Sequence, residues 1–295
     1  MLIPTYSMLI RAQKNFYAVG AFNVYNLEGA TAVIQAAEEL NSPVILQILP
    51  SALKISGSSL VALCREAASA ASVPVSVHLD HCSDEKVIQM ALEAGVCSVM
   101  TNGSALPFKE NVTFTKNIVR MASLYDADVE GELGAIRGNE DGLSAEKIEE
   151  RMTRPDEAVR FLEDTGANAL AVCIGNRHGK YHHLPNLDFE RLAEIEDRVM
   201  APLVLHGASG LSQPLIISAI GLGITKFNVN TEIRSAYLSK IKEFTQQSPA
   251  PELVDLMQAG IDAMVPQVKL KMRLFGSVNK AKEYFNHDAS YFNLN

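Results

Sequence analysis

Short apolar segments alternate with longer amphipathic segments along almost the whole chain, and this alternation restricts the possible folds more than any other feature. Eight segments have the apolar, β-branched character of buried strands, at residues 18–24, 43–48, 74–81, 98–102, 128–133, 169–175, 202–207 and 225–230. Each precedes a segment with helical spacing of its apolar residues, at 27–40, 59–71, 84–94, 108–124, 155–165, 188–199, 213–222 and 231–247. This order is typical of an α/β fold, the (β/α)8 TIM barrel.

The same alternation favours one barrel domain over residues 1–295. No linker rich in Pro, Gly or Ser divides the sequence. Further helices are predicted at 7–14, 251–264 and 265–275, so we expect a C-terminal helical extension from about residue 248. A doubly wound open sheet is the main alternative. It would more naturally carry a Gly-x-Gly-x-x-Gly motif after an early strand, and the sequence has none there.

Composition narrows the expected partners and compartment. The formal net charge is −8, whereas nucleic acids and anionic membranes are bound by clustered Lys and Arg, so we expect neither as a partner. The sequence shows no apolar run of transmembrane length and no signal peptide. Its four cysteines are scattered and form no Cys-x-x-Cys motif, which is typical of reduced thiols in a cytoplasmic protein.

The third expected strand ends in a group of ionisable side chains. It reads Pro-Val-Ser-Val-His-Leu-Asp-His-Cys, and alternate residues of a strand point to opposite faces. The apolar set that includes Val77 should face the helices, so Asp80 should face the barrel interior at its mouth. His81 then begins the loop beside it. The same alternation turns Glu130 and Glu132 of the fifth strand inward.

Two more histidines follow later strands. His178 lies in the polar loop after the sixth strand, and His206 ends the seventh. Active sites of TIM barrels lie at the carboxyl ends of the strands, so both should approach His81. A single histidine at a strand end is more often a hydrogen-bonded structural residue. Three at one rim, with an open fourth position, indicate a catalytic Zn²⁺ site. Glu132 is a candidate for a further ligand.

The loops after the seventh and eighth strands favour phosphate binding. The first reads His-Gly-Ala-Ser-Gly at 206–210, and the second reads Asn-Val-Asn-Thr at 228–231. Barrel enzymes often bind phosphate here through backbone N–H groups and a helix N-terminus. The Ser209 and Thr231 hydroxyls would add donors. Ordinary capped turns explain either loop alone, but both together beside the histidines favour phosphate.

These motifs, in this order, resemble those of the class II, zinc-dependent ketose-bisphosphate aldolases, the family of fructose- and tagatose-bisphosphate aldolases. The first matches are Val-His-Leu-Asp-His-Cys at 77–82, Val-Glu-Gly-Glu-Leu-Gly at 129–134 and Gly-Asn-Glu-Asp-Gly at 138–142. The later matches are Gly-Asn-Arg-His-Gly-Lys-Tyr at 175–181, Leu-His-Gly-Ala-Ser-Gly at 205–210 and Lys-Phe-Asn-Val-Asn-Thr-Glu at 226–232. The similarity extends from residue 18 to residue 277.

The resemblance implies reversible aldol cleavage of a phosphorylated ketose, fructose 1,6-bisphosphate or tagatose 1,6-bisphosphate. The products would be dihydroxyacetone phosphate and an aldehyde such as glyceraldehyde 3-phosphate. Asp80 resembles the acid/base residue at the aldehyde oxygen, and Glu140 resembles the residue that transfers a proton at the ketose carbon. The implied zinc ligands are His81, His178, His206 and, when the metal moves, Glu132.

The resemblance also implies a binding site for the dihydroxyacetone-phosphate half of the substrate. Its residues would be Asn23, Gly179, Gly207, Ala208, Ser209, Asn228, Val229, Asn230 and Thr231. A monovalent cation, Na⁺ or K⁺, is expected near the Gly179 and Ser209 loops. Lys271 and Arg273 are the candidates for binding the distal phosphate. A homodimer or homotetramer is expected.

Some positions depart from the family pattern. Leu49 stands where a small hydroxyl residue is common, Asn102 where Asp is frequent, and Arg137 where Gly or Met is usual. The alternatives are therefore a class II aldolase acting on another phosphorylated sugar or sugar acid, and a non-catalytic aldolase-like accessory subunit. Lysine Schiff-base chemistry is disfavoured, because the sixth strand has no lysine and Lys226 is expected at the far end of the eighth strand.

Overall fold

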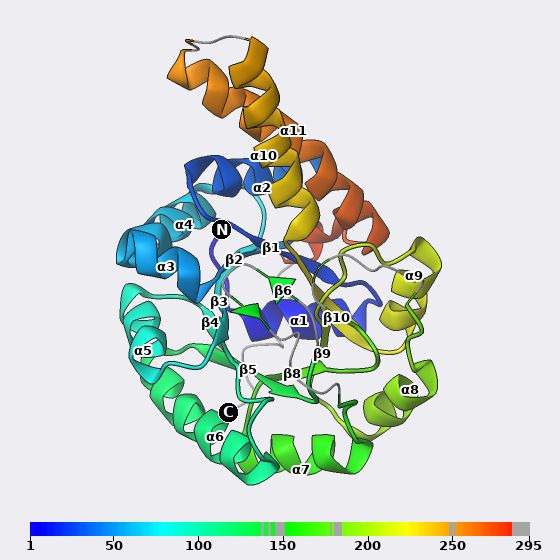
Figure 1. Cartoon of the computed structure of the whole chain (residues 1–295). Coiled ribbons are helices and arrows are strands. Elements are labelled where there is room, and N and C mark those ends of the chain that lie inside the picture. Colours follow the sequence, from blue (N-terminus) through cyan, green and yellow to red (C-terminus); the bar gives the residue numbers. More distant parts are fainter. Residues whose placement is uncertain are drawn as a thin grey trace.

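The computed structural model describes residues 1–136, 139–140, 143–144, 151–177, 179, 185–247, 250 and 252–284; for 139–140 and 143–144 it describes the backbone. Figure 1 looks into a ring of strands surrounded by helices. The strands form a closed barrel in the order β1-β2-β3-β4-β5-β8-β9-β10, with β10 returning to β1. All neighbours in the ring pair in parallel. The predicted (β/α)8 barrel is confirmed.

The eight barrel strands lie where the alternation predicts them, usually one to three residues shorter. They are β1 Val19–Asn23, β2 Val44–Ile48, β3 Val75–Cys82, β4 Ser98–Thr101, β5 Asp128–Leu133, β8 Ala169–Val172, β9 Leu203–Leu205 and β10 Ile224–Val229. Nearly every strand residue is buried, because the barrel interior covers one face and the helices cover the other.

Within the described ranges, eight helices follow the barrel strands and form the outer ring. They are α2 Leu27–Leu40, α4 Ser58–Ala70, α5 Glu85–Ala94, α6 Phe108–Ala122, α7 Pro155–Thr165, α8 Phe189–Arg198, α9 Gln213–Gly221 and α10 Thr231–Gln247. Side chains cap three of them: Asn26 accepts from Gly29 N, Asp84 from Lys86 N, and Asp188 from Arg191 N. The short helices α3 Pro50–Ser56 and η1 Ser123–Tyr125 are additional.

Two apolar cores follow from the alternation of side chains along each strand. The larger core lies between strands and helices and includes Val77 and Leu79, as predicted. The smaller core fills the barrel and includes Ile45 and Val204. Helix α1 (Thr5–Lys14) contributes Met8, Leu9 and Ala12 to the inner core, so it closes the end of the barrel opposite the strands' carboxyl termini.

The C-terminal extension differs from the prediction at one point. Instead of two helices separated near residue 264, a single helix α11 (Leu253–Leu274) continues through Pro266. A proline costs an interior helix one hydrogen bond. Here Val265, Val268 and Met272 are buried against the outer core, and this burial favours a continuous helix. A 3-10 helix, η2 (Lys280–Tyr284), follows.

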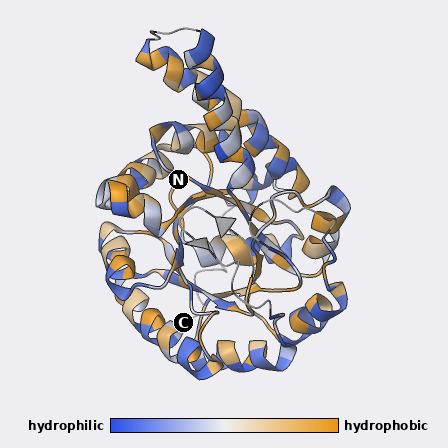
Figure 2. Ribbon diagram, in the orientation of Figure 1, coloured by the Kyte–Doolittle hydropathy of each residue, from blue (hydrophilic) through white to orange (hydrophobic). Residues whose placement is uncertain are grey.

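Helices α10 and α11 pack along each other and extend well beyond the ring (Figure 1). We call the part outside the ring the arm; it carries both hydrophobic and hydrophilic residues (Figure 2). Between β5 and α7, β6 (Asn139–Glu140) and β7 (Leu143–Ser144) form a small antiparallel hairpin. The hairpin overlies the centre of the ring in Figure 1. Across the ranges described above, no helix combines the length and apolar character needed to span a membrane.

Candidate metal and phosphate site

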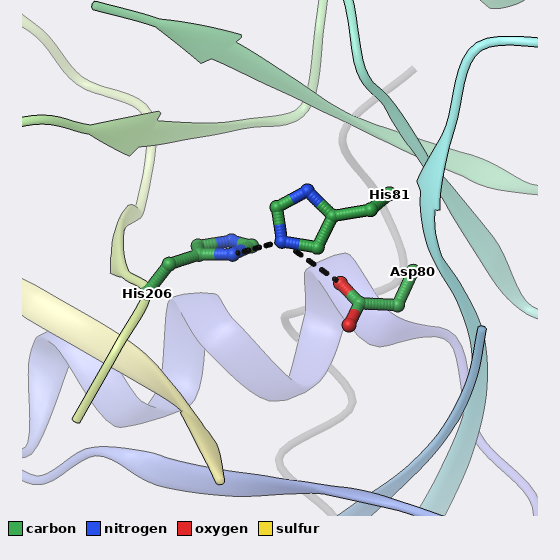
Figure 3. A group of neighbouring side chains, drawn as sticks. All are labelled: Asp80, His81 and His206. Carbon is green, nitrogen blue, oxygen red and sulfur yellow. Dashed lines mark hydrogen bonds and ion pairs between the residues drawn. The ribbon is translucent and has the colours of Figure 1, made fainter. Parts of the chain in front are cut away.

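Asp80 and His81 lie next to each other at the end of β3, yet both side chains reach the barrel mouth. Regular alternation would send them to opposite faces. His81 has a φ of 45°, and the pairing register between β3 and β4 shifts between Leu79 and Cys82. A left-handed backbone is uncommon for a residue other than glycine, and such strain gathers at functional sites. Here it returns the His81 imidazole to the side of Asp80 (Figure 3).

His206, directly after β9, meets these two residues. Its Nδ1 lies 2.8 Å from His81 Nε2, and His81 Nε2 lies 3.9 Å from Asp80 Oδ1. One ligating atom from each residue lies within 4.8 Å of the others, and all three residues are buried (Figure 3). Two imidazole nitrogens and a carboxylate oxygen at these separations suit Zn²⁺, whose preferred protein ligands are nitrogen, sulfur and carboxylate oxygen.

The Asp80 carboxylate is surrounded by side-chain amides from three other strands. Asn23 Nδ2 and Gln47 Nε2 donate to Oδ2 at 3.3 and 3.1 Å, and Asn228 Nδ2 donates to Oδ1 at 3.1 Å. These bonds fix the carboxylate at the mouth of the barrel. Two of these amides also have a buried oxygen with no hydrogen-bond partner among the described residues, Gln47 Oε1 and Asn228 Oδ1, and Asn230 Nδ2 after β10 likewise has none. Such orphaned groups suit a polar ligand.

The third predicted histidine, His178, lies outside the described residues, but its neighbours do not. Asn176 Nδ2 donates to the backbone carbonyl of His206 at 3.1 Å. The Arg177 carbonyl packs so close to Gly207 that a Cβ there would lie 2.0 Å from the carbonyl oxygen. Gly207, with a φ of 69°, therefore permits a contact that a larger residue would prevent. The loop that leads to His178 is thus joined to the loop after His206.

Glu132 and Glu140 are the two glutamates among the predicted site residues, and the structure describes the side chain of Glu132 alone. Glu132, near the end of β5, is 2% exposed and accepts a hydrogen bond from Ser104 Oγ at 2.5 Å. For Glu140 the structure gives the backbone, in β6, where it pairs with Leu143. Its predicted proton transfer stays a prediction.

The predicted phosphate loops meet at the first turn of α10. Ser209 Oγ donates to Glu232 Oε2 at 2.5 Å, and Gly210 N donates to Glu232 Oε1 at 3.1 Å. A cavity of about 560 Å³ lies beside these groups, and Thr231 also lines it. Two groups expected to donate to a phosphate therefore donate to a carboxylate here. Of the other predicted residues of these loops, Ala208 and Val229 are in the outer core.

Lys271 compensates the charge of Glu232. Its Nζ lies 2.8 Å from Glu232 Oε1. Burial opposes ionisation of Glu232, but the Lys271 ammonium and the hydrogen bonds from Lys271 and Ser209 hold the pKa of its carboxyl below the usual value. Lys271, a candidate for the distal phosphate, is thus placed beside the loops after β9 and β10. Arg273, two residues later on α11, is exposed.

Lys226 makes contacts inside the barrel that its position in the sequence does not predict. It was expected to lie away from the site, but its Nζ lies 2.8 Å from Glu130 Oε2, and Glu130 Oε1 lies 2.8 Å from His206 Nε2. Both residues are buried. The alternation of side chains along β10 could have predicted that Lys226 points inward, since Lys226 and Asn228 are two residues apart and share one face. A lysine side chain is long, so the ammonium of Lys226 can lie well away from its Cα, nearer the barrel mouth than the position in the strand indicates.

The charges around Glu130 determine whether its carboxyl group is ionised. Burial alone would raise the pKa of the Glu130 carboxyl, but the Lys226 ammonium and the hydrogen bond with His206 hold it well below its usual value. Burial, with the nearby Lys226 charge, lowers the pKa of His78 well below its usual value. Glu130 is therefore a carboxylate, and it can only accept hydrogen bonds.

A family model and several solved structures match this chain. A family model for class II fructose-bisphosphate aldolases matches residues 3–280. The YdjI aldolase of Escherichia coli K12 is 36% identical, with a TM-score of 0.85 over 95% of this chain and 100% of that chain. A candidate fructose-1,6-bisphosphate aldolase of Coccidioides immitis is 33% identical, with a TM-score of 0.89 over 95% and 98% of the two chains.

A more distant structure agrees in fold. The fructose-bisphosphate aldolase of Campylobacter jejuni is 22% identical, with a TM-score of 0.80 over 95% of this chain and 97% of that chain. The family match extends over nearly the whole barrel and includes the segments that bring Asp80, His81 and His206 together. The chain therefore belongs to the class II fructose-bisphosphate aldolase family, and its chemistry is that of an aldol-cleaving lyase.

Proposed function

We propose that the protein is a zinc-dependent aldolase that reversibly cleaves a phosphorylated ketose to dihydroxyacetone phosphate and an aldehyde. The observation that carries the proposal is the convergence of Asp80, His81 and His206 within 4.8 Å at the barrel mouth, in a chain of this family. A general acid/base and metal-binding imidazoles at one place are what aldol cleavage requires.

Zinc would be held by His81 and His206, with His178 as the third predicted histidine and Glu132 as the predicted further ligand. When bound, zinc supplies positive charge that stabilises the enediolate formed by carbon–carbon cleavage. A lysine imine could serve the same purpose. Lys226 is a poor candidate for it, because its ammonium is buried in an ion pair with Glu130.

The residues of this chain then divide the proton transfers. In cleavage, Asp80 takes the proton from the C4 hydroxyl; the C3–C4 bond breaks, C4 becomes the aldehyde carbon, and the electron pair remains on C3. Glu140, from the β6–β7 hairpin, delivers a proton to C3. The amides of Asn23, Gln47 and Asn228 keep Asp80 oriented between these steps.

The phosphate of the dihydroxyacetone half would bind at the loops after β9 and β10. Support comes from Ser209 Oγ, Gly210 N and the first turn of α10, which already hold the Glu232 carboxylate. Gly179, Gly207 and Asn230 complete the proposed substrate site, with a Na⁺ or K⁺ ion near the Gly179 and Ser209 loops.

Fructose 1,6-bisphosphate and tagatose 1,6-bisphosphate are the first candidate substrates. A different phosphorylated sugar or sugar acid is the second, because Leu49 is 1% exposed and has no hydroxyl to offer the distal half of the substrate. The two relatives above 30% identity do not decide between these, since only one is described by its sugar.

The test is cleavage of both bisphosphates by protein prepared with zinc and after chelation, with release of dihydroxyacetone phosphate as the readout. We expect activity with zinc, its loss on chelation and its return when zinc is restored. His81→Ala and His206→Ala should each lower kcat/KM by roughly 10³-fold or more, since a metal ligand is lost. Cys82→Ala is the matched control, because Cys82 follows His81 but packs in the outer core.

Full activity in metal-free protein would contradict the zinc mechanism. If zinc-loaded protein cleaves neither bisphosphate, condensation of dihydroxyacetone phosphate with a panel of aldehydes distinguishes another sugar substrate from the non-catalytic alternative.

A further inference from the structure

A buried ion pair lies directly behind one of the proposed zinc ligands. Glu130 of β5 and Lys226 of β10 come from strands separated in the ring by β8 and β9, and they meet inside the barrel with Nζ and Oε2 2.8 Å apart. Their side chains are 4% and 0% exposed. The other carboxylate oxygen lies 2.8 Å from His206 Nε2. The pair therefore holds the ring nitrogen of His206 that faces away from His81.

The geometry fixes which nitrogen of His206 carries hydrogen. A carboxylate accepts hydrogen bonds, so the 2.8 Å contact requires that Nε2 of His206 donates to Glu130. In a ring that carries one hydrogen, the lone pair is then on Nδ1. That nitrogen faces His81 Nε2 at 2.8 Å and belongs to the cluster with Asp80. The nitrogen that a metal would need is thus left unprotonated and correctly aimed.

We propose that Glu130 is a positioning residue for the metal site: it selects the tautomer and orientation of His206, and Lys226 holds Glu130 in place. Histidine ligands commonly donate their second N–H to a carboxylate, which fixes the ring and makes it more basic. This inference rests on the proposed metal site and deepens it by adding residues that do not touch the metal.

A purely structural role accounts for the pair less well. A buried ion pair is often no more stabilising than well-packed apolar residues of similar volume, because both charges lose their hydration. Here Lys226 Nζ donates to one carboxylate oxygen of Glu130, and the other oxygen accepts from His206. A third neighbour, His78, contacts Ser98 through Nδ1 at 2.6 Å. Its Nε2 lies 3.9 Å from Glu130 Oε2, too far for a hydrogen bond, and has no partner among the described residues. The specific effect of these contacts is to fix the orientation of the His206 ring.

The experiment measures zinc affinity directly, by competition with a chromophoric chelator, for wild type, Glu130→Gln and Lys226→Met. Glu130→Gln should weaken zinc binding roughly 10- to 100-fold, the usual effect of losing such a partner. Lys226→Met should weaken it in the same direction but less, since His206 keeps its carboxylate. Visible absorption of the Co²⁺-loaded proteins reports the geometry of the ligands, and we expect the Glu130→Gln spectrum to change.

Asp128→Asn is the matched control. Asp128 is two residues before Glu130 on β5, and it accepts from the backbone N of Tyr6 rather than from a histidine. This variant makes the same carboxylate-to-amide change one layer lower, so we expect wild-type zinc affinity and a wild-type Co²⁺ spectrum. A loss of affinity equal to that of Glu130→Gln would show a general effect on the barrel and would overturn the proposal.

The double variant Glu130→Gln with Lys226→Met separates positioning from charge balance. It leaves neither charge buried alone, so it should fold even if a single variant does not. If the pair serves only charge balance, the double variant regains wild-type zinc affinity, and the inference fails. If Glu130 positions His206, zinc affinity stays low. The inference and the proposed function can fail separately, because zinc affinity is measured whether or not a sugar is cleaved.

Discussion

At the scale of single residues, the most informative contact beyond the cluster of Asp80, His81 and His206 is the one between Glu232 and the loop after β9. Glu232 accepts from Ser209 Oγ and Gly210 N, and its charge is balanced by Lys271 Nζ at 2.8 Å. An incoming phosphate would have to share these donors with a carboxylate. Lys271 therefore decides whether this corner of the site attracts or repels an anion.

We predict that Lys271→Met weakens binding of the phosphate next to Glu232. The uncompensated carboxylate should raise the KM for dihydroxyacetone phosphate in the condensation direction about tenfold, corresponding to about 1.4 kcal/mol, with a small change in kcat. Lys269→Met is the matched control, because Lys269 lies on the same helix but pairs with Glu39 of α2. If KM rises for glyceraldehyde 3-phosphate instead, Lys271 binds the distal phosphate directly.

The sequence predicted the positions of these residues better than their contacts. Alternation alone placed Asp80 and Glu130 inside the barrel, because β-strand geometry leaves no other choice. It could not show that His81 turns back to the same side, since that depends on a left-handed backbone and a shifted register. Nor could it show that the Lys226 side chain reaches Glu130, because a long flexible side chain is not fixed by strand geometry.

At the scale of elements, α1 closes the barrel end opposite the mouth and contacts several strands there. Thr5 Oγ1 lies 2.6 Å from both Ser76 Oγ and Ser98 Oγ, and Tyr6 N donates to Asp128 Oδ2 at 2.6 Å. Burial raises the pKa of Asp128 to about 6 from 3.8, although hydrogen bonds from Tyr6 and Thr5 oppose the shift. The contact between α1 and β5 should therefore depend on pH.

The direction of this pH dependence follows from comparing the pKa of Asp128 in the folded and the unfolded protein. The folded pKa of Asp128 lies above the unfolded value, so its contribution to stability is fully present below about pH 4 and is lost as the pH rises through about 6. Asp128→Asn cannot ionise. Relative to wild type it should gain roughly 2–3 kcal/mol between pH 4 and pH 7, about two pKa units at 1.36 kcal/mol each.

The measurement is the thermal midpoint of metal-free wild type and Asp128→Asn across that pH range. The difference between the two midpoints should widen as the pH rises. A difference that stays constant would mean that Asp128 ionises as readily in the folded protein as in the unfolded chain.

Element types were predictable from the sequence, whereas some ends and joins were not. Leu27–Leu40 and Pro155–Thr165 form helices with the predicted bounds, because apolar spacing and a first-turn signal agree there. Two helices are predicted at 251–264 and 265–275, but burial of the residues around Pro266 keeps α11 continuous. The β6–β7 hairpin has two-residue strands, too short for any periodic pattern to reveal.

At the scale of the whole molecule, the arm carries apolar side chains that the barrel of the same chain leaves exposed. Leu238 near the middle of α10 is 56% exposed, and Leu253 and Val254 at the start of α11 are 67% and 75% exposed. A cavity of about 210 Å³ lies at the base of the arm, lined by Tyr237, Leu238 and also by Asn23, which donates to Asp80. Exposed apolar side chains on a projecting arm suit contact with a second copy of the chain.

We therefore predict that Leu253→Glu combined with Val254→Glu breaks the expected homodimer or homotetramer into smaller species. Two carboxylates in an apolar interface lose hydration without gaining partners, so association should be strongly weakened. Light scattering coupled to size-exclusion chromatography measures the molar mass. Met200→Glu is the matched control, because Met200 is 91% exposed and lies before β9, outside the arm. A wild-type protein that elutes as a monomer would contradict the prediction, as would a double variant that keeps the wild-type mass.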